Sequence, residues 1–199
     1  MPVCVSSARN LKSNGKRNKK WLFMRSKNIW IYPLIAIFII VFDQLSKIYI
    51  VNNMVEGQMP VQVFGDFLRF SFVFNTGGAM GTMIGPPWLY LILTIIALTV
   101  IIKYFTTLEP QDTLIKTALA LVFGGAVGNL IDRLRFGKVV DFIDADFPDI
   151  AFLNIERWYT FNIADAAITV GLVFFAITAF FSKKNKADEA EPPEDSQEI

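Results

Sequence analysis

Two aspartates in apolar surroundings are the residues of this sequence best suited to chemistry. Asp141 lies in the apolar run Val139–Ile143, and Asp165 lies in the segment Phe161–Asp165, where another long apolar stretch begins. If the two carboxylates meet, both do not easily ionise together, so they share one proton and one of them stays a base. Such a pair can activate water against an amide carbonyl while the protonated partner donates a hydrogen bond. Carboxylates in apolar segments also serve proton-coupled transport, so position alone leaves both chemistries open.

The composition excludes most other catalytic chemistries. The 199-residue chain has no histidine, which excludes Ser-His-Asp and Cys-His sites and removes the commonest metal ligand. Its single cysteine, Cys4, excludes an internal disulfide and a CxxC metal site. We therefore expect no metal and no cofactor. The net charge of +1 also disfavours nucleic-acid binding by bulk charge.

Four apolar stretches are long enough, or nearly so, to cross a membrane. The hydrocarbon layer is ~30 Å thick, which takes roughly 20 helical residues. Hydrophobic residues make up 53% of the chain and 19 residues are Phe, more than a soluble domain of this size carries. We predict four transmembrane helices over about Ile29–Val51, Pro87–Phe105, Leu114–Leu134 and Phe161–Phe181.

Aromatic residues alternate between the first two spans in a pattern typical of β-strands. Val61–Phe64 and Phe67–Phe74 predict two short strands, with Gly65 and Asp66 at the turn between them. Aromatic residues at this density, next to membrane spans, fit a small sheet at the membrane interface. The predicted fold class is an all-α integral membrane protein of four transmembrane helices with a small β-sheet on the outward face.

The basic residues are distributed unequally along the chain. Thirteen of the 19 Lys and Arg fall in residues 1–28, in the 103–116 connection and in the tail from residue 183. The positive-inside rule then predicts that both termini are cytoplasmic and that segments 52–86 and 135–160 face outward.

We divide the chain into three parts. Residues 1–28 form a basic cytoplasmic extension, residues 29–182 form the four-helix membrane domain, and residues 183–199 form an acidic cytoplasmic tail. The tail is polar and strongly charged, so we expect it to be disordered.

Charged residues inside the first span need partners. An ionised side chain at the centre of a span costs ~2.5–3.5 kcal/mol on insertion scales. Asp43 and Lys47 are four residues apart, on one helix face, so we expect them to pair.

The third span ends in a polar stripe made by Asn129, Asp132 and Arg133. Before this stripe, Gly124 and Gly128 form a small-xxx-small pair, which predicts the close approach of another helix.

Three more acids follow Asp141 in the outward segment. Asp144, Asp146 and Asp149 are not bracketed by apolar residues in the same way, and we interpret them as solvated loop charges.

Five motifs occur in the order seen in lipoprotein signal peptidases, the signal peptidase II family. The chain resembles this family over roughly Ile31 to Phe181, and five motifs in order on a four-span chain are a specific signal. The motifs are Asp43-Gln44-Leu45-Ser46-Lys47, Asn75–Gly81, Gly124–Arg133, Val139–Phe142 and Phe161–Asp165.

The resemblance implies a bacterial aspartic endopeptidase of the inner membrane, with Asp141 and Asp165 as its catalytic pair. Members of the family cut the signal peptide from prolipoproteins just before the diacylglyceryl-modified cysteine. The Phe-rich segment 61–74 resembles the family's outward β-cradle. The resemblance assigns the substrate cleft or its support to Asn75, Gly125, Asn129, Arg133 and Asn162, and structural polar support to Asp43, Lys47 and Asp132.

The implied partners are prolipoproteins that carry diacylglyceryl-cysteine, and membrane lipid, with the enzyme as a monomer and no nucleic acid bound. Two other interpretations stay open at this point. A small proton-coupled carrier would use the same carboxylates near the membrane midplane. A non-catalytic lipid-binding scaffold would tolerate the loss of Asp165.

Overall fold

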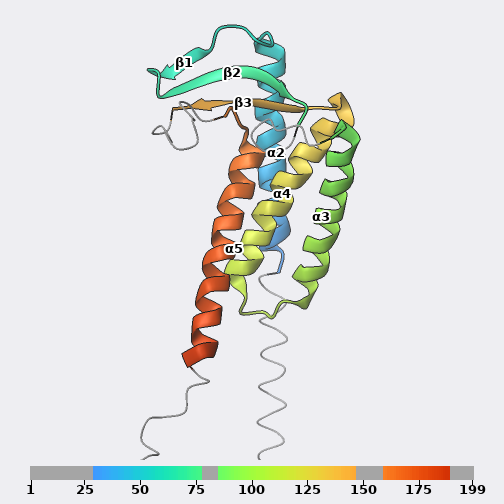
Figure 1. The fold of residues 1–199 in the computed structure, drawn as a ribbon, viewed down its shortest axis with the longest axis vertical. Coiled ribbons are helices and arrows are strands. Elements are labelled where there is room, and N and C mark those ends of the chain that lie inside the picture. Colours follow the sequence, from blue (N-terminus) through green and yellow to red (C-terminus); the bar gives the residue numbers. More distant parts are fainter. Residues whose placement is uncertain (1–28, 78–84, 147–158, 189–199) are drawn as a thin grey trace, which may run out of the picture.

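Four apolar segments of the chain form long α-helices. The computed structural model describes residues 29–77, 85–146 and 159–188, and side chains as far as residue 181. Each of the four helices is long and apolar enough to cross a membrane, which confirms the predicted spans. In the numbering of Figure 1 they are α2 (Ile31–Asn53), α3 (Pro87–Thr107), α4 (Thr113–Phe136) and α5 (Ile163–Asp188).

The helices begin and end where local chemistry requires it. α3 begins with Pro87 at its first position, where the missing N–H costs nothing because that N–H has no partner within the helix. α4 ends at Gly137, which has a φ of 70° and whose N–H bonds to the carbonyl of Arg133. A glycine adopts this left-handed conformation without steric cost, and the chain turns there into the next strand.

A three-stranded antiparallel sheet lies across one end of the helices (Figure 1). Its order is β1 (Val61–Phe64), β2 (Leu68–Asn75) and β3 (Val139–Ala145). The first two strands confirm the prediction from the alternating aromatic residues. β3 comes from the segment that follows α4, so it pairs with β2 although their paired residues lie more than 60 positions apart in the sequence.

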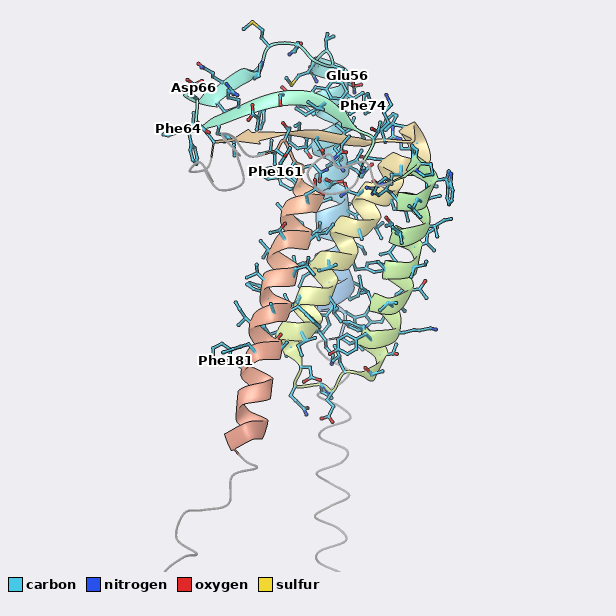
Figure 2. The ribbon with its side chains drawn as sticks, in the orientation of Figure 1. Glu56, Phe64, Asp66, Phe74, Phe161 and Phe181 are labelled. Atoms are coloured by element: carbon cyan, nitrogen blue, oxygen red, sulfur yellow. The ribbon has the colours of Figure 1, made fainter. Side chains whose placement is uncertain are left out.

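Apolar side chains attach the sheet to the helices. Phe72 of β2, with Val140 and Phe142 of β3, forms a buried cluster with Ile50 near the end of α2. Figure 2 shows Phe161 beneath the sheet where α5 begins, and Phe181 far along the same helix. The sheet is therefore held against the end of α2 and the start of α5.

The end of α5 differs from the predicted domain boundary. The helix continues to Asp188, so residues 183–188, which we assigned to the acidic tail, extend it. The basic extension 1–28 and the rest of the tail, 189–199, lie outside the described residues.

Asp144 is not the solvated loop charge that we predicted. Its side chain is 8% exposed, and its Oδ2 accepts a hydrogen bond from Arg69 Nε at 3.0 Å and forms an ion pair with Arg69 Nη2 at 3.0 Å. The prediction was wrong because β3 continues past Asp144 and places it directly opposite Arg69 in the sheet. Asp146 lies at the end of the strand, where its backbone N–H donates to the carbonyl of Phe67. Asp149 lies outside the described residues.

We expect Asp144→Asn to lower the free energy of unfolding by about 1.5–3 kcal/mol, because a two-bonded ion pair becomes a weaker neutral contact. Asp66→Asn is the matched control, since Asp66 lies 3.7 Å from the same guanidinium but is 74% exposed. An exposed pair of this kind contributes at most about 1 kcal/mol. Thermal unfolding in detergent measures both variants, and equal losses would contradict a structural role for the Arg69–Asp144 pair.

Candidate active site

β3 and the start of α5 bring the two predicted aspartates to one place. Ile143 and Phe161 form an isolated antiparallel bridge, with N–H to carbonyl distances of 2.7 and 3.0 Å. Asp141 lies two residues before this bridge, and Asp165 lies four residues after it, in the first turn of α5. The site therefore lies at the end of the helix bundle, next to the sheet.

Asn162 bonds to both carboxylates. Its side-chain Nδ2 donates to Asp141 Oδ1 at 2.7 Å, and its backbone N–H donates to Asp165 Oδ2 at 3.2 Å. Its Oδ1 accepts from the backbone N–H of Asp165 at 2.9 Å. The exchange between Asn162 and Asp165 has the form of a capping box, which satisfies helix N–H groups reciprocally. One fully buried side chain thus caps α5 and positions both acids.

Asp141 is almost completely buried, with 3% of its surface exposed. Its second oxygen accepts from Asn75 Nδ2 of β2 at 3.0 Å. Burial, and then the nearby charge of Asp165, raise the pKa of Asp141 from 3.8 to about 7, although the bonds from Asn75 and Asn162 oppose the shift. The Asp141 carboxyl therefore changes its charge near neutral pH, as a catalytic acid or base must.

Asp165 is only partly buried and faces α4. Its Oδ1 accepts from Asn129 Nδ2 at 2.8 Å. Arg133, one turn further along α4, donates to the backbone carbonyl of Asn129 and interacts electrostatically with Asp165 and Asp141. An amide and a guanidinium of α4 therefore face the carboxylate of α5.

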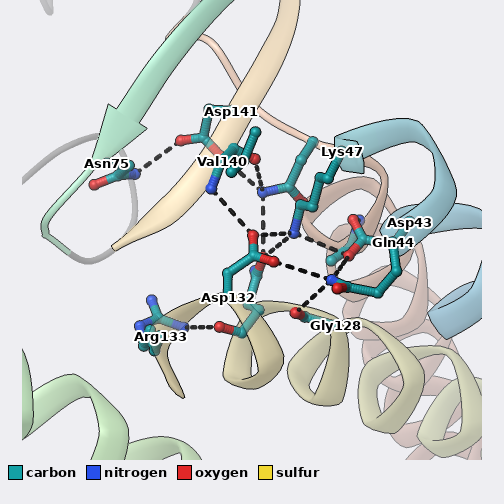
Figure 3. A network of polar contacts seen from close by, with 12 residues as sticks. Asp43, Gln44, Lys47, Asn75, Gly128, Asp132, Arg133, Val140 and Asp141 are labelled. Carbon is teal, nitrogen blue, oxygen red and sulfur yellow. Dashed lines mark hydrogen bonds and ion pairs between the residues drawn. The ribbon is translucent and has the colours of Figure 1, made fainter. Parts of the chain in front are cut away.

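The buried ammonium group of Lys47 lies within the network of polar contacts beside Asp141 (Figure 3). Lys47 Nζ is 2.9 Å from Asp43 Oδ2, 2.9 Å from Asp132 Oδ2 and 3.0 Å from Asn129 Oδ1. An ammonium has three N–H bonds, so all of its donors are satisfied. The predicted Asp43–Lys47 pair is confirmed, and Asp132 and Asn129 complete the set of acceptors.

The two acids that pair with Lys47 also hold the backbone of the site. Asp43 Oδ1 accepts from the N–H of Ala164 at 3.0 Å, and Asp132 Oδ2 accepts from the N–H of Val140 at 3.1 Å. Ala164 immediately precedes Asp165, and Val140 immediately precedes Asp141. Each backbone segment that carries one member of the pair is thus fixed by a buried carboxylate of another helix.

Gln44 belongs to this network, although we did not select it from the sequence. Its Nε2 lies 3.0–3.2 Å from Asp132 Oδ1, Asp43 Oδ2 and the carbonyl of Gly128. The available signal was a polar side chain inside an apolar span, beside Asp43. The side chain thus links α2 to α4 beside the ammonium contacts (Figure 3).

Glycines of α4 let the other helices approach closely. A Cβ on Gly124 would lie 2.9 Å from the carbonyl oxygen of Ala36, and one on Gly128 would lie 2.6 Å from Asp43 Oδ2. A Cβ on Gly125 would collide with the carbonyl oxygen of Ala164. The predicted close approach is confirmed, and Gly125 contributes by packing α4 against the start of α5.

The structure brings the predicted site residues together at one end of the bundle. Hydrogen bonds or ion pairs connect all of them except Gly125, which acts through packing; the connected residues are Asp43, Lys47, Asn75, Asn129, Asp132, Arg133, Asp141, Asn162 and Asp165. Within the described parts of the chain, no group of three or more His, Cys, Asp or Glu side chains is placed to hold a metal ion.

We expect Gly125→Ala to destabilise the protein by about 1–3 kcal/mol, because the added methyl group forces α4 and α5 apart. Helix propensity alone predicts the opposite, a gain of up to about 1 kcal/mol. Ala97→Leu is the control for added bulk, since Ala97 is exposed on α3. Thermal unfolding in detergent decides, and a stabilised Gly125→Ala variant would contradict the packing described for this position.

Comparison with known proteins identifies relatives along most of the chain. A family described as Signal peptidase (SPase) II matches residues 35–181. The lipoprotein signal peptidase of Moorella thermoacetica is 36% identical over 142 residues, which cover 71% of this chain and 87% of that protein. The lipoprotein signal peptidase of Staphylococcus aureus is 35% identical over 161 residues, covering 78% and 91%.

Solved structures show the same fold. One, described as a bacterial membrane enzyme, superposes with a TM-score of 0.72 at 31% identity, covering 86% of this chain and 96% of that one. A second, described in the same words, has a TM-score of 0.67 at 34% identity, covering 76% and 94%.

Proposed function

Since the chain belongs to the signal peptidase II family of aspartic peptidases, which cleave the signal peptides of prolipoproteins, we propose that Asp141 and Asp165 are its catalytic pair. The observation that carries the proposal is that Asn162 bonds to both carboxylates, so that they share one polar site. The pair also lies where a membrane helix ends, beside the sheet, rather than at mid-helix as the carrier interpretation requires (Figure 1).

The reaction follows from one ionised and one protonated carboxyl group. The ionised carboxylate takes a proton from water as the water oxygen bonds to the carbonyl carbon of the peptide. The protonated carboxyl donates to the carbonyl oxygen and stabilises the charge that develops there. When the C–N bond breaks, the leaving nitrogen takes the proton that water lost, and the second carboxyl regains its own.

We propose that the substrate carries diacylglyceryl-cysteine and is cut just before that residue. Such a substrate has an apolar signal helix and two acyl chains, so the scissile bond must be reached from the lipid bilayer. The outer faces of the helices expose large apolar side chains along their length, among them Leu34, Phe38 and Leu172. Surfaces of this kind are compatible with lipid contact and with the entry of a substrate from the side.

We also propose that the enzyme acts as a monomer.

We propose that both termini are cytoplasmic and that the catalytic pair faces the outer side of a bacterial membrane. The 107–113 connection between α3 and α4 lies at the end of the bundle opposite the sheet (Figure 1). Lys103 and Lys116 adjoin this connection, and they belong to the basic residues counted in the sequence, which supports the orientation. The same argument supports 1–28 and 183–199 as cytoplasmic flanks of a 29–182 peptidase domain.

We expect Asp141→Asn and Asp165→Asn each to lower prolipoprotein cleavage by about 10²–10⁴-fold, because either change removes one half of the acid–base pair. The measurement is cleavage of a diacylglyceryl prolipoprotein by purified protein at equal membrane abundance. Asp66→Asn, which alters an exposed acid of the hairpin, is expected to retain full activity. Wild-type cleavage by either site variant would refute the assignment of the pair.

We expect activity to fall above about pH 7, by about tenfold for each pH unit, as Asp141 loses its proton and the pair becomes doubly charged. The raised pKa of Asp141 also affects stability. Between pH 3.8 and about 7 the folded protein retains a proton that the unfolded chain has released, so the free energy of unfolding falls as pH rises.

The pH dependence of kcat/KM tests the first expectation, and thermal unfolding over the same range tests the second. Asp141→Asn is the control for stability, because it should lack this part of the pH dependence. A rate that stays flat from pH 6 to about pH 9 would contradict the role given to the Asp141 proton.

A further inference from the structure

We propose that Lys47 is a positioning residue for catalysis: it fixes the orientation of the Asn129 amide, and this makes Asp165 the ionised member of the pair and Asp141 the protonated one. The inference rests on the proposed function of the two aspartates. It goes beyond the support of the fold, because it assigns a different task to each carboxyl group.

The first step is the contact between Lys47 and Asn129. An ammonium can only donate, so Asn129 Oδ1 must face Lys47 Nζ, from which it lies 3.0 Å away. The same oxygen also accepts from Asn162 Nδ2 at 3.2 Å. If the amide were rotated by half a turn, its NH₂ group would face two donors and its oxygen would face a carboxylate. Lys47 therefore directs the Asn129 NH₂ group toward Asp165, which it reaches at 2.8 Å.

The second step is the independent fixation of Asn162. Its Oδ1 accepts from the backbone N–H of Asp165, which is another group that can only donate. The Asn162 NH₂ group must then face Asp141, Asn129 and the carbonyl of Val140. Lys47 and the backbone N–H of Asp165 can only donate hydrogen bonds. These two groups therefore fix the orientation of both amides and the direction of each hydrogen bond from Lys47 through Asn129 to Asp165.

The third step is the difference between the two carboxyl groups. Asp165 lies in the first turn of α5, where the helix dipole favours a negative charge, and it accepts a backbone N–H. Asp141 lies in the middle of a buried strand, with no helix end to stabilise a charge. Burial, which raises the pKa of Asp141 to about 7, is the larger cause of the shift and Asp165 the second, in agreement with a proton held on the strand.

The charged groups around the pair act in both directions. The charge of Lys47 lowers the pKa of Asp141, whereas the guanidinium on α4 described next favours a charge on Asp165. Arg133 of α4 interacts more strongly with Asp165 than with Asp141. Asp132 of α4 and Asp43 of α2 would both oppose a charge on Asp165, and the single positive charge of Lys47 offsets one of these two negative charges. From β2 and β3, Arg69 and Asp144 pair with each other and add no net charge.

The assignment divides the reaction between the two aspartates. The Asp165 carboxylate takes a proton from water while the water oxygen forms its bond to the carbonyl carbon. Asp141 gives its proton to the carbonyl oxygen, which yields an uncharged tetrahedral intermediate. As the C–N bond breaks, Asp165 gives its proton to the leaving nitrogen, and one hydroxyl of the intermediate returns a proton to Asp141.

The test uses a charge-balanced variant, Lys47→Met with Asp132→Asn. This variant removes one positive and one negative charge together. It also removes the ammonium that orients Asn129, so that only the neutral Asn162 NH₂ group, at 3.2 Å, still donates to Asn129 Oδ1. If Lys47 positions the amide, the acidic limb of the kcat/KM profile, which reports the ionised carboxylate, moves to higher pH by about one unit or more. We expect kcat to fall at least about tenfold while KM changes little.

A purely structural role makes a different prediction for the same variant. The variant would unfold at a lower temperature, but the dependence of kcat/KM on pH, measured on the protein that stays folded, would keep its shape. That result would overturn the inference while the loss of activity in Asp141→Asn and Asp165→Asn would leave the proposed function intact.

A second variant keeps the inference testable if the double variant does not fold. Asn129→Ser is too short to donate to Asp165, so it should also move the acidic limb. Asn75→Ser is its matched control, because Asn75 donates to Asp141 and should move the basic limb instead. If Asn129→Ser moved only the basic limb of the kcat/KM profile, Asp165 would be the protonated member of the pair and the assignment would be wrong.

Discussion

The ion-pair network around Lys47 is the interaction on which the rest of the site depends. One ammonium joins Asp43 of α2 to Asp132 of α4, and each of these acids uses an oxygen to hold a backbone N–H beside a member of the proposed catalytic pair. A buried charge without partners is strongly unfavourable, so this arrangement has few alternatives. The ion pairs inside the helix bundle therefore determine the positions of β3 and of the start of α5.

The low-polarity surroundings explain why the network is so complete. Where water is scarce, each polar group needs a partner in the protein, and the described residues contain only one buried side-chain oxygen or nitrogen without one, the hydroxyl of Ser71. Glycines along α4 serve the same requirement, since they bring carboxylate and amide groups of other helices within bonding distance. The close packing of the helices and the pairing of their buried polar groups therefore depend on the same glycines of α4.

Patterns within short stretches of the sequence predicted much of this structure. Apolar length gave the four spans, aromatic alternation gave β1 and β2, and the four-residue spacing gave the Asp43–Lys47 pair. Contacts between distant segments were less accessible. The pairing of β3 with β2 depends on a register between strands far apart in sequence, and it is this register that buries Asp144 against Arg69. Gln44 was missed because its partners lie on another helix.

The bridge between Ile143 and Phe161 has a consequence for how this enzyme diversifies. β3 continues from Ile143 to Ala145, and the backbones of Ile143 and Phe161 are bonded to each other. Insertions or deletions between Asp146 and Tyr159 need not disturb either aspartate. Evolution can therefore vary this stretch in length and composition, and an engineer can graft a recognition segment there, while the hydrolytic machinery is inherited unchanged.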